Sequence, residues 1–241
     1  MTLRYCPRCE RRLLVQSNPV VGRCPGCRWE GGPRDFLSEP KPPMQPWTPY
    51  VSIDTETTGL DPQWCQVLEF GAVLEDWRSP VDQLPFFHRY LKYEEVTGNP
   101  YALALNAEIL RKIAAADPAT PMCVPEELGD QFANWLVDYK LDPKKVTAAG
   151  KNFASFDLQF LYHLPQFKER VHFRHRAIDP ATLYWQPDVD DALPGTAECL
   201  KRAELDDHVA HTAIADARAV IQLIRRGVTK CELSLASKLR S

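Results

Sequence analysis

The stretch YVSIDTETTGL, residues 50–60, combines strand-forming residues with two carboxylates. Successive side chains of a β-strand point to opposite faces, so Asp54 and Glu56 share one face and Ile53 lies on the other. Two acids placed in this way stand about 7 Å apart along the strand. They repel each other unless a cation neutralises them. By itself, the pair also fits a surface strand whose acids face water.

The residues around this stretch alternate between strand-like and helix-like patterns. A strand over 50–54 is followed by two more over 66–75 and 86–92, which we expect to form an antiparallel meander. Three strands followed by alternating helices and strands indicate an α/β or α+β domain over 50–241, with a mixed sheet flanked by helices, and we take α/β as the fold class. The other predicted elements are helices over 101–116, 125–139, 153–164, 195–203 and 211–226 and short strands over 146–149 and 177–179.

A third acid, Asp157, interrupts the apolar face of the helix predicted over 153–164. It stands four residues before Leu161, so both side chains lie on the same side of the helix. A carboxylate on a packing face is unfavourable unless it is paired or binds a metal. The alternative is a structural acid near the helix N-terminus, stabilised by the helix dipole, with Asn152 or Ser155 as the cap.

A fourth acid lies in HTAIADARAVIQLI, residues 211–224. Asp216 stands four residues before Val220, at the border of the apolar stripe of a predicted helix. His211 precedes that helix, and from there its ring can turn toward the same acid. A lone histidine is most often structural or exposed, and His208 shows that histidine is not rare in this region. His211 is of interest because of the acid that follows it at a fixed interval.

Together these residues give the pattern D-x-E, F-D and H-x4-D, with each acid on the interior side of its element. Carboxylate oxygens without thiolates suit Mg²⁺ or Mn²⁺. Four such acids around two ions form the arrangement used for in-line attack on a phosphodiester, in which one ion generates hydroxide and the other stabilises the leaving oxygen. A neutral histidine nearby can take the proton from the attacking water.

Three segments resemble the motifs of the DEDDh branch of the DEDD exonuclease superfamily. DTETTGL, residues 54–60, is similar to the first motif, GKNFASFDLQFL, residues 150–161, to the second, and HTAIADA, residues 211–217, to the third. QVLEFGAV, residues 66–73, also matches the strand that usually follows the first motif. The resemblance covers residues 50–226. The superfamily includes the proofreading subunit of bacterial replicative DNA polymerase, ribonuclease T and oligoribonuclease.

This resemblance implies an RNase H-like fold, two Mg²⁺ or Mn²⁺ ions in the active site, and release of 5′-mononucleotides from 3′ ends. Carried over by position, it implies metal ligands at Asp54, Glu56, Asp157 and Asp216, a general base at His211, a backbone contact to the terminal nucleotide at Thr57, and packing on its base at Leu60. The catalytic positions match the family pattern without departure. The arginine or asparagine that usually follows the third-motif histidine is Thr212 here, a change that we expect to be tolerated.

Two C-x-x-C pairs near the start of the chain predict a zinc site at Cys6, Cys9, Cys24 and Cys27. Such pairs supply four thiolates in a tetrahedral array, which makes a closed structural site for one Zn²⁺. Residues 1–31 resemble a zinc ribbon, and the βαβ context of a thioredoxin-like redox motif is absent. The arginines of this head favour nucleic acid as its partner, but a protein partner stays open.

A proline-rich segment over 32–49, with six prolines, joins this head to the body. Its composition favours an extended polyproline-type conformation, so we interpret it as a semi-rigid linker. Residues 1–34 contain seven arginines and two glutamates, a net charge of +5, which leaves −8 for the rest of a chain whose total is −3. This total argues against a protein that coats long duplexes electrostatically.

The chain has no apolar run near the roughly 18 residues needed to span a bilayer, and its first residues lack the apolar region of a secretory signal. We therefore expect a soluble cytoplasmic protein with no membrane partner. Cysteines in that compartment are reduced, which is consistent with a metal site.

The sequence thus predicts a metal-dependent 3′→5′ exonuclease that acts on single-stranded nucleic-acid 3′ ends. A rival interpretation is a zinc-ribbon adaptor for nucleic acid or a replisome protein that keeps an idle exonuclease fold. A third is a proofreading subunit that acts only with a polymerase or another replication or repair protein. The basic run over 168–176 either lines a path for the substrate backbone or forms a solvated edge. The choice between DNA and RNA stays open.

Overall fold

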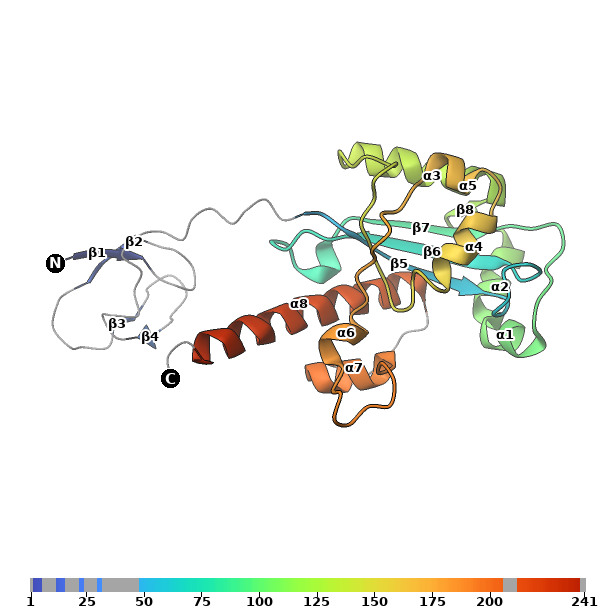
Figure 1. Ribbon diagram of the computed structural model, residues 1–241. Helices are drawn as coiled ribbons and strands as arrows, with labels where there is room; N and C mark the ends of the chain where they lie inside the picture. Colours follow the sequence, from blue (N-terminus) through green and yellow to red (C-terminus); the bar gives the residue numbers. More distant parts are fainter. Residues whose placement is uncertain are drawn as a thin grey trace. The chain divides into compact units, whose positions relative to one another are not determined.

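The computed structural model divides the chain into two compact units, Met1–Thr48 and Pro49–Ser241 (Figure 1). The residues that it describes are 2–5, 12–15, 22–23, 30–31, 48–205 and 212–238, with side chains over 48–205 and 212–229.

The described part of the first unit consists of two antiparallel strand pairs. β1 (Thr2–Tyr5) pairs with β2 (Arg12–Val15), and β3 (Gly22–Arg23) pairs with β4 (Glu30–Gly31). Outside the described residues lie the four predicted zinc ligands, Cys6, Cys9, Cys24 and Cys27. The zinc ribbon therefore stays a prediction.

The second unit is built on a mixed sheet with the strand order β8-β7-β6-β5-β9. Its central strands form the predicted antiparallel meander, while β9 runs parallel to β5 and β8 parallel to β7. The strands are β5 (Val51–Thr57), β6 (Val67–Leu74), β7 (Phe86–Leu91), β8 (Met122–Cys123) and β9 (Ala148–Ala149). Of the strand predicted over 177–179, the structure contains a single bridge between Ala149 and Ile178.

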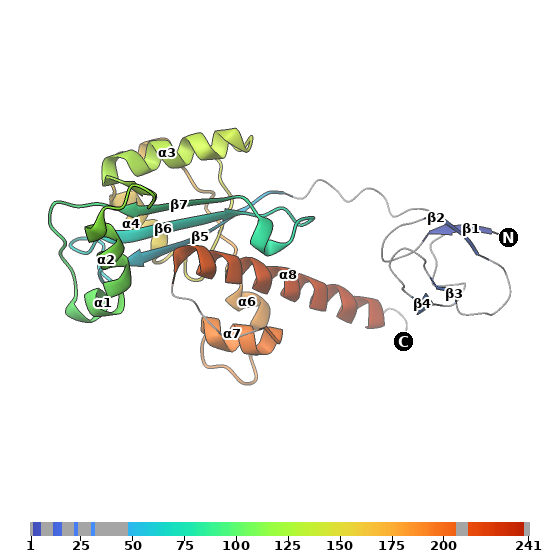
Figure 2. The same ribbon diagram turned by 180° about the vertical axis from the view of Figure 1, so that it is seen from behind.

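Helices cover both faces of this sheet (Figures 1 and 2). On one face lie α3 (Pro125–Asp138), α4 (Asp157–His163) and α5 (Phe167–Arg170). On the other lie α6 (Ala181–Tyr184), α7 (Thr196–Ala203) and the long α8 (Ala213–Lys238), which packs on β5 and β6. The short η1 (Val81–Gln83) precedes β7, and α1 (Pro100–Leu105) and α2 (Ala107–Ala115) lie beside the end at which β5 finishes. The predicted mixed sheet flanked by helices is confirmed.

The two faces of β5 bury different sets of side chains. Val51 and Ile53 belong to the larger core beneath α3, α4 and α5, which contains a group of edge-on and stacked phenylalanines around Phe132. The α8 face has a smaller core, in which Val73 of β6 packs with Val220 and other aliphatic residues of α8. Aromatic pairs in these geometries stabilise a core beyond the apolar area that they bury. Because side chains alternate along β5, Asp54 and Glu56 point away from Ile53 and lie on the face that α8 covers.

The helix predicted over 101–116 is two helices, because a tertiary contact interrupts it at Asn106. Asn106 is buried, and its side-chain amide donates a hydrogen bond of 3.0 Å to the carbonyl oxygen of Thr57. The contact joins the helical segment to the end of β5. The prediction of one continuous helix was therefore wrong at this residue.

The helix predicted over 153–164 begins later, at Asp157. Asn152 adopts a left-handed conformation with φ 58°, and the backbone N–H groups of Ser155 and Phe156 both donate to its carbonyl. Asparagine is one of the few residues that tolerate this conformation. The resulting turn places Asp157 in the first turn of α4, where the helix dipole stabilises a negative charge.

None of the described helices combines the length and the apolar character that a bilayer span requires.

Candidate active site

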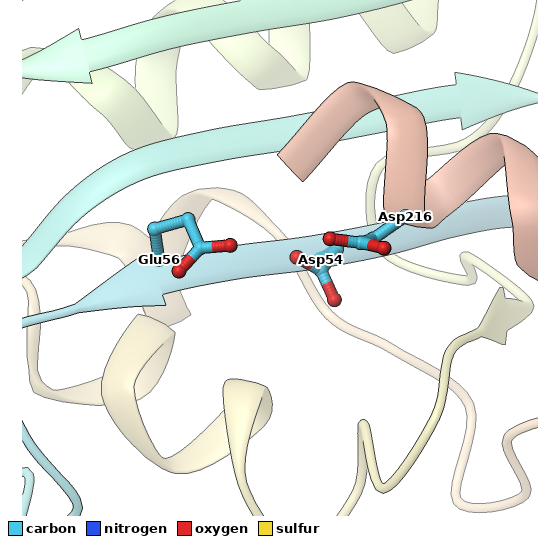
Figure 3. A group of neighbouring side chains, drawn as sticks. All are labelled: Asp54, Glu56 and Asp216. Atoms are coloured by element: carbon cyan, nitrogen blue, oxygen red, sulfur yellow. The ribbon is translucent and has the colours of Figure 1, made fainter. Parts of the chain in front are cut away.

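Three carboxylates from two elements meet on the α8 face of the sheet (Figure 3). Asp54 and Glu56 point from β5, and Asp216 reaches toward them from the first turn of α8. One oxygen of each carboxylate lies within 4.8 Å of the others. We call these residues the three-carboxylate group. The acids of the first and third sequence motifs are therefore neighbours in space.

The approach of α8 to the sheet depends on Gly71 of β6, which stands opposite Asp54 in the strand register. A Cβ atom at this glycine would lie 2.6 Å from the carbonyl carbon of Ala213 and 2.8 Å from its oxygen. Atoms of a real side chain do not approach backbone so closely, so α8 would have to move. Gly71 thus allows the first turn of α8 to bring Asp216 to β5.

Asp157 joins the site from the other side of β5. It is 2% exposed, and its Oδ1 accepts hydrogen bonds from the backbone N–H of Thr55, at 2.9 Å, and from the Thr55 hydroxyl, at 2.7 Å. The Thr55 N–H is available because β9 ends at Ala149, whose register partner on β5 is Ser52. Asp157, the acid of the second motif, is therefore held at the sheet edge next to the three-carboxylate group. Its oxygens do not lie within 4.8 Å of all three of the other carboxylates.

The acids of the site disfavour each other's charge. Burial, followed by the charges of Asp157, Asp216 and Glu56, raises the pKa of Asp54 well above its ordinary value. Burial and the nearby acids, Asp216 first among them, raise the pKa of Glu56 to about 7, against a hydrogen bond from Asn106 that lowers it. Unbalanced negative charge of this kind is what a bound cation would relieve.

Burial also raises the pKa of Asp157 to about 7, although its hydrogen bonds with Thr55 oppose the shift. All four donor side chains are carboxylates, which are hard oxygen ligands. Their chemistry fits Mg²⁺ or Mn²⁺ better than a soft metal ion. The residues present are thus suited to divalent cations.

A pocket of about 420 Å³ opens beside Glu56. Its wall is largely apolar, with exposed Leu60 and Tyr101 at the rim. Its lining residues are Thr55, Glu56, Thr57, Gly59, Leu60, Asp61, Trp64, Asn99, Tyr101, Ala102, Leu105, Asn106 and Phe156. An apolar pocket with a few convergent polar groups is the usual form of a small-molecule site. Thr57 and Leu60, the predicted substrate-binding residues, both line it.

His211, the predicted general base, lies outside the described residues. Its neighbour Thr212 accepts a hydrogen bond of 3.0 Å from the backbone N–H of Asp216. The role of the histidine therefore stays a prediction.

The exposed basic run over 168–176 is only partly paired. Arg170 pairs with Asp130 at 2.7 Å, and the Lys168 ammonium lies 5.4 Å from the ring centre of Tyr162. Arg174 and Arg176 form no ion pair with any other described residue. A path for the substrate backbone along this run stays a prediction.

Sequence reasoning missed a further acid, Glu69 of β6, which is 1% exposed. His88 Nε2 lies 2.7 Å from Glu69 Oε1. A charged residue inside VLEFGAVL, residues 67–74, was a visible signal, because an acid in an otherwise apolar strand needs a partner. The histidine that provides it lies on the next strand and has no local signature.

The sequence model of the family described as Exonuclease (RNase_T) matches residues 51–224. The match includes every acid of the site and the whole sheet of the second unit. No curated protein is similar enough in sequence to count as a match.

Several solved structures share the fold. The nuclease domain of 3′hExo, a DEDDh family member bound to rAMP, has a TM-score of 0.56 at 15% identity, over 76% of this chain and 92% of that one. E. coli Exonuclease I in complex with a dT13 oligonucleotide has a TM-score of 0.52 at 16% identity, over 74% of this chain and 40% of that one. Exonuclease I from Methylocaldum szegediense has a TM-score of 0.51 at 20% identity, over 74% of this chain and 40% of that one. This chain therefore spans less than half the length of those Exonuclease I chains. The expected RNase H-like exonuclease fold is confirmed.

Proposed function

Because this chain belongs to the Exonuclease (RNase_T) family, we propose that it is a 3′→5′ exonuclease that hydrolyses phosphodiester bonds and releases 5′-mononucleotides. The observation that carries the proposal is the three-carboxylate group, whose oxygens meet within 4.8 Å beside an apolar pocket. Such a group provides a cation site next to a place where a nucleotide fits.

In this proposal the metal ligands are Asp54, Glu56, Asp157 and Asp216, which hold two Mg²⁺ or Mn²⁺ ions. When bound, such ions supply a hydroxide nucleophile and stabilise the leaving oxygen. The protein contributes fixed positions. β5 spaces two of the acids, Gly71 lets α8 bring the third, and Thr55 orients the fourth. Fixed ligands lower the reorganisation needed at the moment of reaction.

His211 is the proposed general base. In the sequence it stands five residues before Asp216, so the chain leads it toward the three-carboxylate group. An imidazole has an ordinary pKa near neutrality, which suits a group that accepts a proton from water and passes it on.

The pocket is the proposed seat of the 3′-terminal nucleotide. Leu60 is 85% exposed and Tyr101 is 78% exposed, so both present apolar surface on which an unpaired base can pack. Thr57 is the proposed backbone contact to the same nucleotide. Its side chain is already occupied, since its hydroxyl donates to the Gly59 carbonyl at 2.7 Å. A base that packs in this way must be free of its complement, which favours single-stranded 3′ ends as substrates.

The N-terminal head is the proposed site of one structural Zn²⁺, held by Cys6, Cys9, Cys24 and Cys27. Its arginines favour a grip on the substrate strand. A polymerase or another replication or repair protein is the alternative partner for the same surface. Among the neighbours in fold, one structure holds a dT13 oligonucleotide and another holds rAMP. DNA and RNA are therefore both to be tested.

The test is digestion of matched DNA and RNA oligonucleotides, single- and double-stranded, labelled at the 5′ end, with Mg²⁺ and with EDTA. We expect a ladder that shortens from the 3′ end, 5′-mononucleotides as products, and no cleavage in EDTA. A chain that binds the oligonucleotides without cleaving any of them in Mg²⁺ or Mn²⁺ would instead be an adaptor with an idle fold.

A further inference from the structure

Glu69 lies on the same face of the sheet as the three-carboxylate group. It stands directly opposite Glu56 in the register of β5 and β6, and Gly71, two residues further, stands opposite Asp54. Side chains opposite each other on neighbouring strands have Cβ atoms about 5 Å apart. The charge of Glu69 consequently adds to the raised pKa values of both Asp54 and Glu56.

Only one oxygen of the Glu69 carboxylate has a partner. His88 Nε2 lies 2.7 Å from Oε1, across the diagonal of the β6–β7 pair, whereas the buried Oε2 makes no hydrogen bond with any described residue. The His88 ring itself packs against Tyr90 in a T-shaped geometry, with ring centres 4.7 Å apart. The carboxylate is therefore fixed at one oxygen, and its other oxygen is left without a partner in an acid-rich region.

Such an arrangement is unfavourable for folding alone. A buried carboxylate oxygen without a hydrogen bond is destabilising, and two further acids nearby add repulsion. Glutamine has the same shape, accepts a hydrogen bond from His88 and carries no charge. The contact with His88 is thus all that offsets the charge of Glu69 among the described residues when cations are absent.

We propose that Glu69, held in direction by His88, is a positioning residue of the cation site, which increases the attraction of the three-carboxylate group for divalent cations. The inference rests on the proposed function of that group. Glu69 acts through Asp54 and Glu56 rather than by touching the substrate. Outer residues that orient and polarise metal ligands typically change metal affinity by about 10–100-fold when they are mutated.

Glu75, which directly follows β6, provides a matched control. It is 3% exposed, its Oε1 accepts hydrogen bonds from Arg225, and its Oε2 has no partner among the described residues. Its surroundings differ, because Arg225 faces it instead of the three-carboxylate group. Glu69→Gln and Glu75→Gln thus remove the same charge from equally buried sites.

The experiment measures Mn²⁺ binding to the full chain by titration calorimetry, with Asp54→Asn as the blank, together with melting in EDTA. For Glu69→Gln we expect about a tenfold weaker Mn²⁺ affinity, a matching rise in the Mg²⁺ concentration that gives half-maximal cleavage, and a Tm in EDTA equal to or above wild type. For Glu75→Gln we expect wild-type Mn²⁺ affinity and a lower Tm.

His88 variants test the positioning role. His88→Leu removes the partner of Glu69 and should weaken Mn²⁺ binding, whereas His88→Gln keeps an N–H donor and should restore it. This pair also carries the test if Glu69→Gln does not fold. Wild-type Mn²⁺ affinity in both Glu69→Gln and His88→Leu overturns the inference. Wild-type affinity in Asp54→Asn as well means that the three-carboxylate group is not the cation site, and the proposed function fails with it.

Discussion

The two ends of β6 each bury a glutamate, and the two glutamates have opposite surroundings. Glu69, near the start of the strand, faces Asp54 and Glu56, whereas Glu75, directly after its end, faces Arg225. We call these regions the acid-rich end and the paired end. Residue type and burial are the same at both, so neither feature by itself identifies a functional site.

At the paired end the charges hold elements together. Arg225 of α8 donates to Glu75 at 2.8 Å and to the carbonyl oxygens of Asp76 and Ser79, which fixes the helix to the loop after β6. At the acid-rich end like charges gather, and the same helix contributes one more acid through Asp216. Breaking a buried ion pair lowers the stability of the fold. Removing one of several acids that repel each other reduces the repulsion and therefore raises the stability. Removal of an acid should therefore lower the stability at the paired end and raise it, in the absence of cations, at the acid-rich end.

The largest effect is expected for Asp157→Asn at the acid-rich end. The asparagine oxygen still accepts the Thr55 hydrogen bonds but no longer provides a charged ligand. Because cation catalysis is worth several kcal/mol, cleavage should fall by about 10³-fold or more. The Tm in EDTA should not fall. Digestion of a labelled oligonucleotide in Mg²⁺ measures the rate.

The control for Asp157→Asn is Asp190→Asn, which breaks the ion pair between Asp190, in the loop before α7, and Arg202 of α7. That variant should melt at a lower temperature and keep its activity per folded molecule. A rate for Asp157→Asn near wild type refutes the assignment of Asp157 as a ligand.

Loss of the general base is the next effect in size. His211→Ala should lower kcat by about 10²–10⁴-fold while Mn²⁺ binding survives, because the residue moves a proton and does not ligate the cation. The acidic limb of the pH–rate profile should change as well. His208→Ala is the control and should be mild. If His211→Ala also abolishes Mn²⁺ binding, the histidine is a ligand or a structural residue.

Gly71→Ala tests whether the acid-rich end depends on the close approach of α8. The added methyl group would meet the backbone of Ala213, so the first turn of α8 and Asp216 should shift. A displacement of about 1 Å in a catalytic group can lower the rate by about 10²-fold. Overpacking should also lower stability by about 1–3 kcal/mol.

Gly195→Ala is the matched control for Gly71→Ala, since a Cβ at that position meets no other atom within 4 Å. It should leave kcat unchanged and lower the free energy of unfolding by no more than about 1 kcal/mol, because Gly195 is the N-cap residue of α7. Equal rates for the two glycine variants would mean that Gly71 does not position Asp216.

The contrast between the ends of β6 also explains what sequence could predict. Strand alternation around Asp54, and the position of Asp157 on an apolar helix face, are local patterns, and both acids lie where those patterns indicated. The Gly71–Ala213 contact joins residues far apart in the chain, so no local pattern reveals it. The break at Asn106 was missed for the same reason, since its cause is a bond to Thr57.

The start of helix α4, near the site, also depends on residues that are distant in the sequence. The sequence predicted a helix from 153, but the left-handed Asn152 and the turn after it delay α4 to Asp157. The backbone N–H of Asn152 donates to Asp179 at 3.0 Å, which holds this turn from another segment. Periodicity locates a helix face reliably, whereas helix ends follow contacts that the sequence does not display.

Stability should fall with rising pH when cations are absent. Glu56 and Asp157, whose pKa values are both raised to about 7, bind more protons in the folded state than in the unfolded chain between about pH 4 and 7. The folded state therefore loses stability through this window, by on the order of 3 kcal/mol for Glu56 alone. In EDTA, the Tm should drop by several degrees between pH 5 and 8.

Two controls sharpen the pH experiment. Asp54→Asn removes a carboxyl group whose own pKa is raised by burial and by the neighbouring acids, and should flatten the profile. Mg²⁺ should raise the Tm more at pH 8 than at pH 5, because protons and cations compete for the same carboxylates. A wild-type Tm in EDTA that rises from pH 5 to 8, and is unaffected by Asp54→Asn, contradicts the electrostatic account of the acid-rich end.

The smallest effect concerns substrate capture. Apart from its first 34 residues the chain carries a net charge of −8, to which the acid-rich end contributes, so it repels a polyanion away from bound cations. The head carries a formal charge of +5, or about +3 with the proposed Zn²⁺ on four thiolates, and can keep a strand nearby. Deletion of residues 1–46 should raise KM on long single strands by about tenfold through lost effective concentration. The value of kcat should stay unchanged, because the lost contacts bind ground and transition states equally.

Substrate length and salt distinguish this role from its alternative. Di- and trinucleotides are too short to reach both units, so their KM should not change on deletion. On long strands, the difference in KM should shrink as salt rises, because contacts between arginines and phosphates weaken through counterion uptake. If the truncated protein matches the full chain on long and short substrates at low salt, the head does not serve substrate binding. A docking site for a protein partner is then the better interpretation of its arginines.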